Sequence, residues 1–150
     1  MNVARPLVFS VHGIRTRGAW QKTDLTAELN AAGFDHIPLD YGFFTAIRLL
    51  LPWARRKQVE WFRDEYTRLS NTREQLPSVI AHSFGTYLVA RAIELFPEVK
   101  FNKIILCGSI VREDFPWSAM VQERKQANRV LNEYGHMDLW ALVARCFVGD

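Results

Sequence analysis

The stretch from Ser78 to Leu88, SVIAHSFGTYL, constrains the fold more than any other part of the chain. Near its start stand Val79 and Ile80, an apolar, β-branched pair that the breaker Pro77 precedes, and this pattern indicates a short buried strand. A polar turn with Ser83 at its point follows, and small residues stand two positions to either side, Ala81 and Gly85. Small side chains there let the backbone turn sharply and let the next element lie close to the strand.

The residues after Ser83 predict a helix that begins directly at the turn. Apolar side chains recur at helical spacing, and Pro97 ends the run. The apolar positions are Phe84, Leu88, Val89, Ala92, Ile93 and Phe96. A serine at such a turn is lifted toward a neighbouring base, which it needs because its hydroxyl is a weak nucleophile. The first N–H groups of the helix point at the same place and would stabilise an oxyanion.

This strand, turn and helix resemble the nucleophile elbow of the α/β-hydrolase superfamily, whose pattern is Gly-x-Ser-x-Gly. Ala81 stands in place of the first Gly, a departure that some members tolerate. The resemblance implies that Ser83 is the catalytic nucleophile. It also implies that the backbone N–H of Phe84 donates to the oxyanion and that His82 lies beside the substrate.

A second shared feature follows the first predicted strand, Leu7 to Val11. In α/β-hydrolases a His-Gly pair follows this strand, and the residue after the Gly gives another oxyanion N–H. The resemblance assigns that role to Ile14 and places His12 and Gly13 at the substrate. Gly13 frees the backbone to turn this N–H inward. From the residues alone His12 is equally a loop histidine held by backbone groups, and we expect it to shape the loop and not to act as the base.

The third shared feature follows the last predicted strand, Arg129 to Tyr134, where His136 and Asp138 precede a predicted helix. α/β-Hydrolases hold the acid of the catalytic triad after this strand, so the resemblance makes Asp138 the acid that orients the base. The same residue would also serve as a helix cap, a role in which Asp is favoured. Glu113 and Asp114 are alternatives, because some members place the acid after the preceding strand.

The catalytic base is the missing part of this pattern. In the family the histidine follows one further strand after the acid, whereas this sequence ends at Asp150. His136 is the histidine nearest to the acid and would need an unusual loop to reach Ser83. Three explanations stay open: a fragment of a longer hydrolase, a base from His136 or from a second chain, or an inactive relative that binds without catalysis.

The whole chain, 1–150, is expected to form one domain with a truncated α/β-hydrolase fold. Alternating strands and helices predict a doubly wound, mostly parallel five-stranded sheet with helices on both faces. The expected order is second, first, third, fourth and fifth strand, which leaves the fifth as an exposed edge for pairing with a second copy. The other predicted elements are a helix from Trp20 to Ala32, an edge strand from His36 to Tyr41, a helix with Val59, Phe62, Tyr66 and Leu69 on its apolar face, and a strand from Lys103 to Cys107.

The composition limits the size of the core and the classes of partner and cofactor. A hydrophobic content of 49% allows a sizeable core, and a net charge of +3 is too small to indicate a nucleic-acid partner. The basic run Arg55-Arg56-Lys57 fits a solvated helix start. Cys107 and Cys146 are expected to be buried reduced thiols, which favours a cytoplasmic protein. Neither metal-ligand spacing nor a phosphate-binding glycine loop is found, so no metal or cofactor is expected.

The segment from Phe43 to Trp53 is the most apolar in the chain, but it is too short to span a bilayer and carries Arg48. A core-packed wall is the simpler interpretation, and contact with a membrane surface is the alternative. The amino terminus does not resemble a signal peptide. The resemblance thus predicts a serine hydrolase acting on an ester, thioester or similar acyl bond of a small molecule. The alternative is a catalytically inactive binding or assembly module of the same fold.

Overall fold

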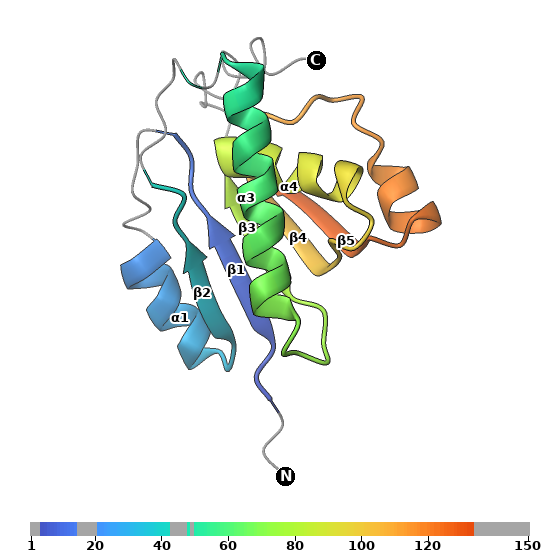
Figure 1. The fold of residues 1–150 in the computed structure, drawn as a ribbon. Coiled ribbons are helices and arrows are strands. Elements are labelled where there is room, and N and C mark those ends of the chain that lie inside the picture. The colour runs from blue at the N-terminus through green and yellow to red at the C-terminus, as the bar shows by residue number, and fades with distance from the viewer. Residues whose placement is uncertain (1–3, 15–20, 43–47, 49, 134–150) are drawn as a thin grey trace.

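The computed structural model describes residues 4–14, 21–42, 48 and 50–133 of the chain (Figure 1). Over these ranges strands alternate with helices along the sequence. The strands are β1 (Leu7–Val11), β2 (Asp35–Leu39), β3 (Ser78–His82), β4 (Phe101–Cys107) and β5 (Ala127–Glu133). The helices are α1 (Thr26–Ala31), α3 (Pro52–Ser70) and α4 (Phe84–Leu95), with π-helical turns η1 (Gln21–Leu25) and η2 (Ala119–Glu123).

The described strands form one sheet in the order β2-β1-β3-β4-β5, and each pairing is parallel. This confirms the predicted strand order and fold class. The order reverses at β1, because the chain continues from β1 to β2 on one side and β3 lies on the other. In open parallel sheets, ligands bind outside the carboxyl ends of the strands at such a switch point. The ends of β1 and β3 are therefore where a site is expected.

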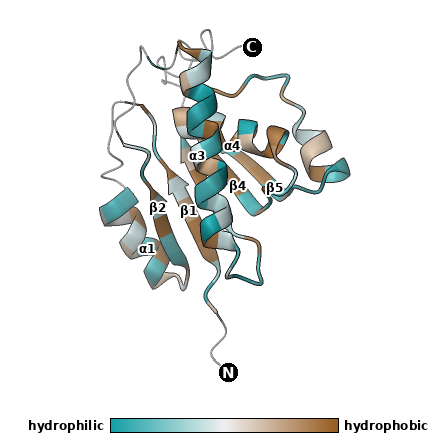
Figure 2. Cartoon of the chain, in the orientation of Figure 1, coloured by the Kyte–Doolittle hydropathy of each residue, from teal (hydrophilic) through white to brown (hydrophobic). Residues whose placement is uncertain are grey.

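Among the described residues, α3 and α4 lie over one face of the sheet, and α1 lies beside β2 (Figure 1). On one face, Phe62 and Tyr66 of α3 pack against Phe101, with ring centroids 6.4 and 5.3 Å away. α1 lies on the other face, where its Thr26 hydrogen-bonds His36 of β2. Figure 2 shows hydrophobic colours on the strands and mainly hydrophilic colours on the outward side of α3. Parallel sheets need this cover because both of their faces are apolar.

The first predicted helix differs most from the structure. Instead of one helix from Trp20 to Ala32, η1 is followed by the short α1, and Trp20 lies outside the described residues. The Thr26 hydroxyl donates to the Gln21 carbonyl at 2.5 Å. Such side-chain bonds compete with the regular helical pattern, and a scan for apolar spacing does not detect them.

Three strands are shifted from their predicted bounds. β4 and β5 each begin two residues early, β2 spans 35–39 instead of 36–41, and the predicted last residue of the fifth strand, Tyr134, lies outside the described residues. Pairing explains the early starts, since the Phe101 N–H donates to the Gln126 carbonyl at 2.8 Å, just ahead of β5. The prediction followed apolar residues, and so it missed strand ends where an exposed residue such as Asn102 still pairs.

The apolar segment before α3 is only partly in the core. Leu50 and Trp53 are 50% and 65% exposed, so the core-packed interpretation is wrong for these two side chains. Residues 43–47 and 49 lie outside the described ranges. The solvated interpretation of the basic run is wrong for Arg55, which is buried with its guanidinium 5.9 Å from the centre of the Tyr87 ring. In the part of the chain that the structure describes, no helix has the length and apolar character needed to cross a membrane.

β5 lies at one edge of the described sheet, as expected. Its exposed residues include Asn128, Arg129, Asn132 and Glu133. Charged side chains at an edge strand disfavour pairing with another sheet. The dimer through β5 therefore stays a prediction, and the polar character of the strand opposes it. On the neighbouring β4, Cys107 is a free thiol that is half-buried, where a buried one was expected. Burial, and then the charge of Glu133, raises the pKa of this thiol.

Candidate functional site

Ser83 occupies the turn between β3 and α4 with φ 52° and ψ −119°, a backbone conformation that disfavours any side chain. The Ser83 N–H donates to the Cys107 carbonyl at 3.0 Å. The Ser83 carbonyl accepts from the Thr86 N–H at 3.0 Å and from the Thr86 hydroxyl at 2.6 Å. That hydroxyl accepts from the Ile110 N–H at 3.1 Å. The neighbouring elements thus hold a strained residue whose side chain is half-buried.

Two glycines bring the end of β1 against this turn. A Cβ on Gly85 would lie 2.6 Å from the Val11 carbonyl oxygen, so only glycine lets α4 approach β1 this closely. A Cβ on Gly13 would lie 2.8 Å from the Ser83 Cβ and 3.2 Å from its Oγ. The loop after β1 therefore faces the Ser83 side chain directly.

His12 is fully buried and holds this loop. Its Nδ1 lies 2.8 Å from the Gly13 carbonyl oxygen, and its Nε2 lies 3.4 Å from the Asp40 Oδ1. The Tyr41 ring stacks on the imidazole with centroids 4.2 Å apart, and the Tyr41 hydroxyl donates to the His12 carbonyl at 2.9 Å. Lys22 Nζ donates to Asp40 at 2.8 Å, and this bond contributes most to lowering the pKa of the carboxyl.

Asp40 and Tyr41 also belong to the candidate site, and neither was predicted from the sequence. Both directly follow β2 at the carboxyl edge of the sheet, next to β1. Polar residues at that edge were a usable signal, but the apolar pattern had extended the strand through them. Burial, and then the charge of Asp40, raises the pKa of Tyr41 well above its ordinary value, so its hydroxyl stays a hydrogen-bond donor.

No protein-family model matches the chain, and no curated protein matches it. The crystal structure of lysin B from mycobacteriophage D29 matches over 97% of this chain and 74% of that chain, with a TM-score of 0.68 and 12% identity. A Xanthomonas campestris protein assigned to the α/β hydrolase superfamily matches over 96% of both chains, with a TM-score of 0.57 and 16% identity. This chain has an α/β-hydrolase-like fold.

At these identities the likeness concerns the fold alone. Within the α/β-hydrolase-like fold, one group of predicted site residues lies at the carboxyl ends of β1 and β3. The group consists of His12, Gly13, Ile14, His82, Ser83 and Phe84. His136 and Asp138 lie outside the described residues, and their roles stay predictions.

Glu113 and Asp114, the two alternative candidates for the acid of the triad, lie on the loop after β4. Asp114 is exposed and pairs with Arg112 through two bonds, 2.9 Å from Nε to Oδ1 and 2.7 Å from Nη2 to Oδ2. The bond to Arg112 lowers the pKa of Asp114. Glu113 is also exposed. An arginine, and not a histidine, is thus the partner that the structure gives Asp114.

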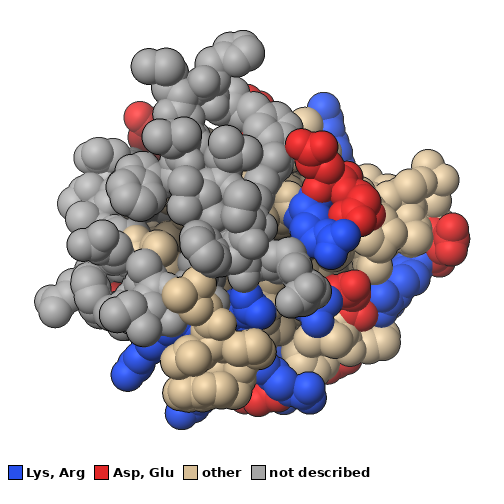
Figure 3. Space-filling model, turned by 90° about the horizontal axis from the view of Figure 1, so that it is seen from above, with Lys and Arg blue, Asp and Glu red and all other residues tan. Residues whose placement is uncertain are grey.

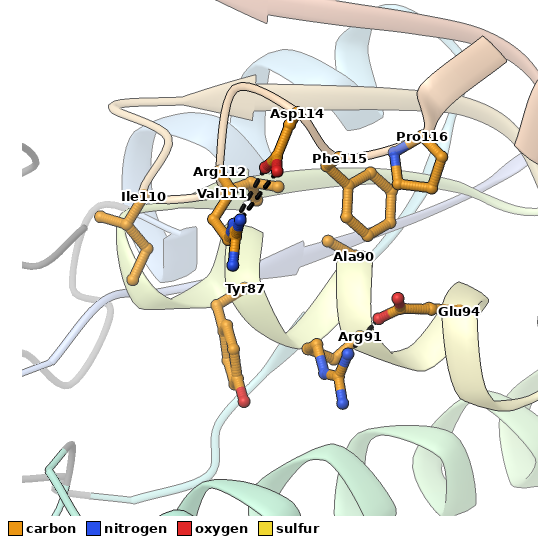
Figure 4. Close-up of a pocket in the computed structure, with 10 residues that line it drawn as sticks. All are labelled: Tyr87, Ala90, Arg91, Glu94, Ile110, Val111, Arg112, Asp114, Phe115 and Pro116. Atoms are coloured by element: carbon orange, nitrogen blue, oxygen red, sulfur yellow. Dashed lines mark hydrogen bonds and ion pairs between the residues drawn. The ribbon is translucent and has the colours of Figure 1, made fainter. Parts of the chain in front are cut away.

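A cavity of about 200 Å³ lies between α4 and the loop after β4 (Figure 4). Tyr87 and Ala90 of α4 line one side, and Val111 and Phe115 line the other. Two ion pairs flank the cavity, Arg91 with Glu94 and Arg112 with Asp114. Ser83 directly precedes α4 and Tyr87 is four residues further along, so the cavity begins about one helical turn from the serine.

A larger cavity, of about 570 Å³, lies on one face of the sheet, where Val8, Ile80 and Ile105 of the paired strands line it. It extends to the amino-terminal ends of the strands, where Pro6, Ser78 and Asn102 line it. Figure 3 views the molecule from the carboxyl ends of the strands and shows basic and acidic side chains mixed over the described part of that surface. Within the described ranges, no group of three or more His, Cys, Asp or Glu residues is placed to hold a metal ion.

A ring of hydrogen-bonded polar side chains lies beside the candidate site. Gln21 Nε2 donates to the Ser10 hydroxyl at 2.8 Å, and Ser10 Oγ lies 2.7 Å from His36 Nε2. His36 Nδ1 lies 2.8 Å from the Thr26 hydroxyl, which donates onward to the Gln21 carbonyl. These contacts fit a neutral His36. Its Nδ1 carries the hydrogen and donates to the Thr26 hydroxyl, and its Nε2 accepts a hydrogen bond from the Ser10 hydroxyl. Burial lowers the pKa of His36, in agreement with a neutral ring.

This network predicts a pH-dependent loss of stability. The unfolded chain takes up a proton on His36 as the pH falls below about 6.5, whereas the folded chain does so only at lower pH. The free energy of unfolding should therefore fall as the pH decreases through this window. Urea unfolding at pH 8 and pH 5 checks this, with His36→Asn as the comparison. Equal pH-dependent losses in both proteins would contradict the assignment of a neutral, buried His36.

Proposed function

We propose that the chain is a serine hydrolase that cleaves an ester, thioester or similar acyl bond of a small molecule. The observation that carries the proposal is Ser83, held in a strained turn between β3 and α4 with the Gly13 loop against its side chain. Strain at a non-glycine residue persists where the surrounding structure enforces it, and such residues cluster at functional sites. The α/β-hydrolase-like fold supports the same reaction class.

In this proposal the Ser83 hydroxyl attacks the carbonyl carbon while a base accepts its proton. The carbonyl oxygen becomes an oxyanion held by the N–H groups of Ile14 and Phe84. When the tetrahedral intermediate collapses, the leaving group departs with the proton from the base, and the acyl group stays on Ser83 Oγ. Water then attacks this ester by the same route, which releases the acid and restores the hydroxyl. Phe84 is the first residue of α4, where the helix dipole favours a negative charge, and this suits its N–H to the task.

We propose His136 as the base and Asp138 as the acid that orients it. Both follow β5 in the sequence, and in this fold the loops after the strands meet at one edge of the sheet. His12 is a poor candidate for the base, because both of its ring nitrogens already contact acceptors, the Gly13 carbonyl and Asp40. We propose that His82 lies beside the substrate. Its Nδ1 is 3.4 Å from the position that a Cβ on Gly13 would take, so its side chain lies next to the Gly13 loop.

The test is labelling with a fluorophosphonate probe, followed by mass spectrometry of the labelled peptide. We expect the label on Ser83, and we expect His136→Gln to slow labelling by roughly 10²- to 10⁴-fold, the contribution of a general base. A folded chain that does not react would overturn the proposal in favour of the inactive binding or assembly module. Undiminished labelling of His136→Gln would assign the base to another group or a second chain.

The proposal extends to how an acyl substrate lies. The cavity along α4 begins near Ser83, and its Tyr87, Val111 and Phe115 walls suit an apolar group of the substrate. Contact of the Phe43–Trp53 segment with a membrane surface is a further part of the proposal, supported by the exposure of Leu50 and Trp53.

A further inference from the structure

The described residues cover the two faces of the sheet unequally. Val79 of β3 and Ile104 of β4 are register partners and are fully buried. They lie on the α3 side, because Phe9, the register partner of Val79, has its ring centroid 6.3 Å from that of an α3 tyrosine. Ile80 and Ile105 follow them and point to the opposite face, where both are partly exposed. Parallel sheets bury both faces, so this second face needs cover beyond what the described residues supply.

The second face carries an apolar groove, which we call the sheet groove. It is the cavity of about 570 Å³ whose lining includes Val8, Ile80 and Ile105 of the strands, together with Leu29 of α1 and Phe34. The groove therefore runs over β1, β3 and β4 beside α1. Apolar surface left in water is unfavourable, so the groove favours an apolar occupant.

The sheet groove continues as an apolar row and has a basic end. Leu131 of β5 is the register partner of Ile105 and is also partly exposed, so the row reaches the edge strand. Lys103 and Arg129 are register partners nearer the amino-terminal ends of the strands, and both are exposed. An occupant that matches this surface presents apolar side chains to the row and negative charge to the basic end.

The sequence after β5 has this character. Residues 134–150 lie outside the described residues, and their sequence predicts a helix after Asp138. Its apolar residues recur at the spacing i, i+3, i+4, i+7 and i+8 that marks one face of an amphipathic helix. These are Leu139, Leu142, Val143, Cys146 and Phe147. We propose that this predicted helix, residues 139–147, packs its apolar face into the sheet groove.

The length and direction of the chain support this packing. β5 ends at the carboxyl edge of the sheet, and residues 134–138 leave a connection of ordinary length. A helix that follows returns along the face toward the amino-terminal ends of the strands. Residues 139–147 span about 12 Å as a helix, which fits within the roughly 16 Å of a five-residue strand such as β3. The helix then ends near Lys103 and Arg129, whose charges complement the negative end of its dipole and the carboxylate of Asp150.

Packing in the sheet groove also has a consequence for the proposed site. It anchors residues 134–138 at both ends, by β5 on one side and by the packed helix on the other. This connection carries His136 and Asp138 at the edge of the sheet where Ser83 lies. The consequence for catalysis rests on the proposed function, whereas the packing itself does not.

The first test is cross-linking within the full chain by a short bismaleimide. Cys107→Ser leaves Cys146 as the one native cysteine, and a second cysteine is placed either in the groove, Lys103→Cys, or on the opposite face, Arg56→Cys. Both replaced side chains are exposed, so neither change disturbs the core. We expect an internal link in the Lys103→Cys chain, at a rate roughly tenfold or more above that in the Arg56→Cys chain, because a linker reacts only where it can span the sites.

The other outcomes of this test count against the proposal. Equal linking of the two chains, or a folded Lys103→Cys chain without an internal link, would show that the segment does not lie in the groove. Links between chains, seen as dimers, would assign the groove to a second copy instead.

The second test is the alkylation rate of Cys146 in the Cys107→Ser chain. We expect iodoacetamide to react roughly 10²-fold more slowly than in urea, since a packed helix must open first. Leu142→Asp places a charge on the apolar face and should remove most of this protection. Ala141→Asp is the matched control, because position 141 lies on the opposite side of the predicted helix, and its rate should be unchanged. A Cys146 as reactive in the folded chain as in urea would overturn the proposal, whether or not Ser83 is reactive.

Discussion

Replacing Ser83 by alanine is expected to abolish fluorophosphonate labelling and to lower kcat for a reactive ester on the order of 10⁶-fold, as loss of a base-activated serine does. The reason is local: the proposed chemistry has one nucleophile, and the Gly13 loop faces this side chain. Ester hydrolysis and intact-protein mass after probe treatment are the measurements. Hydrolysis that survives in Ser83→Ala would place the reaction elsewhere.

Ser83→Gly separates the chemistry from the backbone strain. With φ 52° and ψ −119°, a residue with a Cβ is strained by about 1–3 kcal/mol. Glycine relieves this strain but adds about 0.4–1 kcal/mol of unfolded-chain entropy. Ser83→Gly should therefore exceed Ser83→Ala in free energy of unfolding by about 1 kcal/mol, although neither variant reacts. A glycine variant that is less stable than the alanine variant in urea would show that the turn stores no strain.

Gly85→Ala is expected to disturb both the fold and the site. The added Cβ would lie 2.6 Å from the Val11 carbonyl oxygen and 3.0 Å from that of His12, and neither backbone atom can yield without moving the end of β1. Overpacking of this kind costs up to about 3 kcal/mol, and alanine returns about 1 kcal/mol in helix propensity. We expect a net loss of about 2 kcal/mol in urea unfolding. Labelling of Ser83 should slow as well, because the displaced strand end carries the Gly13 loop.

Gly33→Ala is the matched control for that variant. Gly33 has φ +88° with nothing within 4 Å of an added Cβ, so its substitution adds strain without a clash. We expect a loss of about 1–2 kcal/mol in stability and an unchanged labelling rate. Equal labelling rates in Gly85→Ala and Gly33→Ala would mean that the close contact between α4 and β1 does not govern the site.

Local sequence was enough for the central strand, turn and helix, because the period of apolar residues and the small residues beside Ser83 act over a few positions. It was also enough for the strand order, since alternating strands and helices allow few arrangements of a parallel sheet. The likeness to two solved structures, one of them a protein assigned to the α/β hydrolase superfamily, supports the same fold class. Helix and strand bounds were less accurate, because the Thr26 hydroxyl and the Gln126 carbonyl set them through bonds that no apolar pattern reports.

Only the tertiary structure placed Asp40 and Tyr41 on His12, more than twenty positions earlier in the chain. The same holds for Arg55, which the sequence presents as part of a solvated basic run and the fold buries near Tyr87. Gly85 is the sharpest case: the sequence marks it as a small residue in a turn, but its contact is with the Val11 carbonyl of another strand. Local patterns report periodicity and turn chemistry, whereas contacts between distant residues exist only once the strands have paired and the helices have packed.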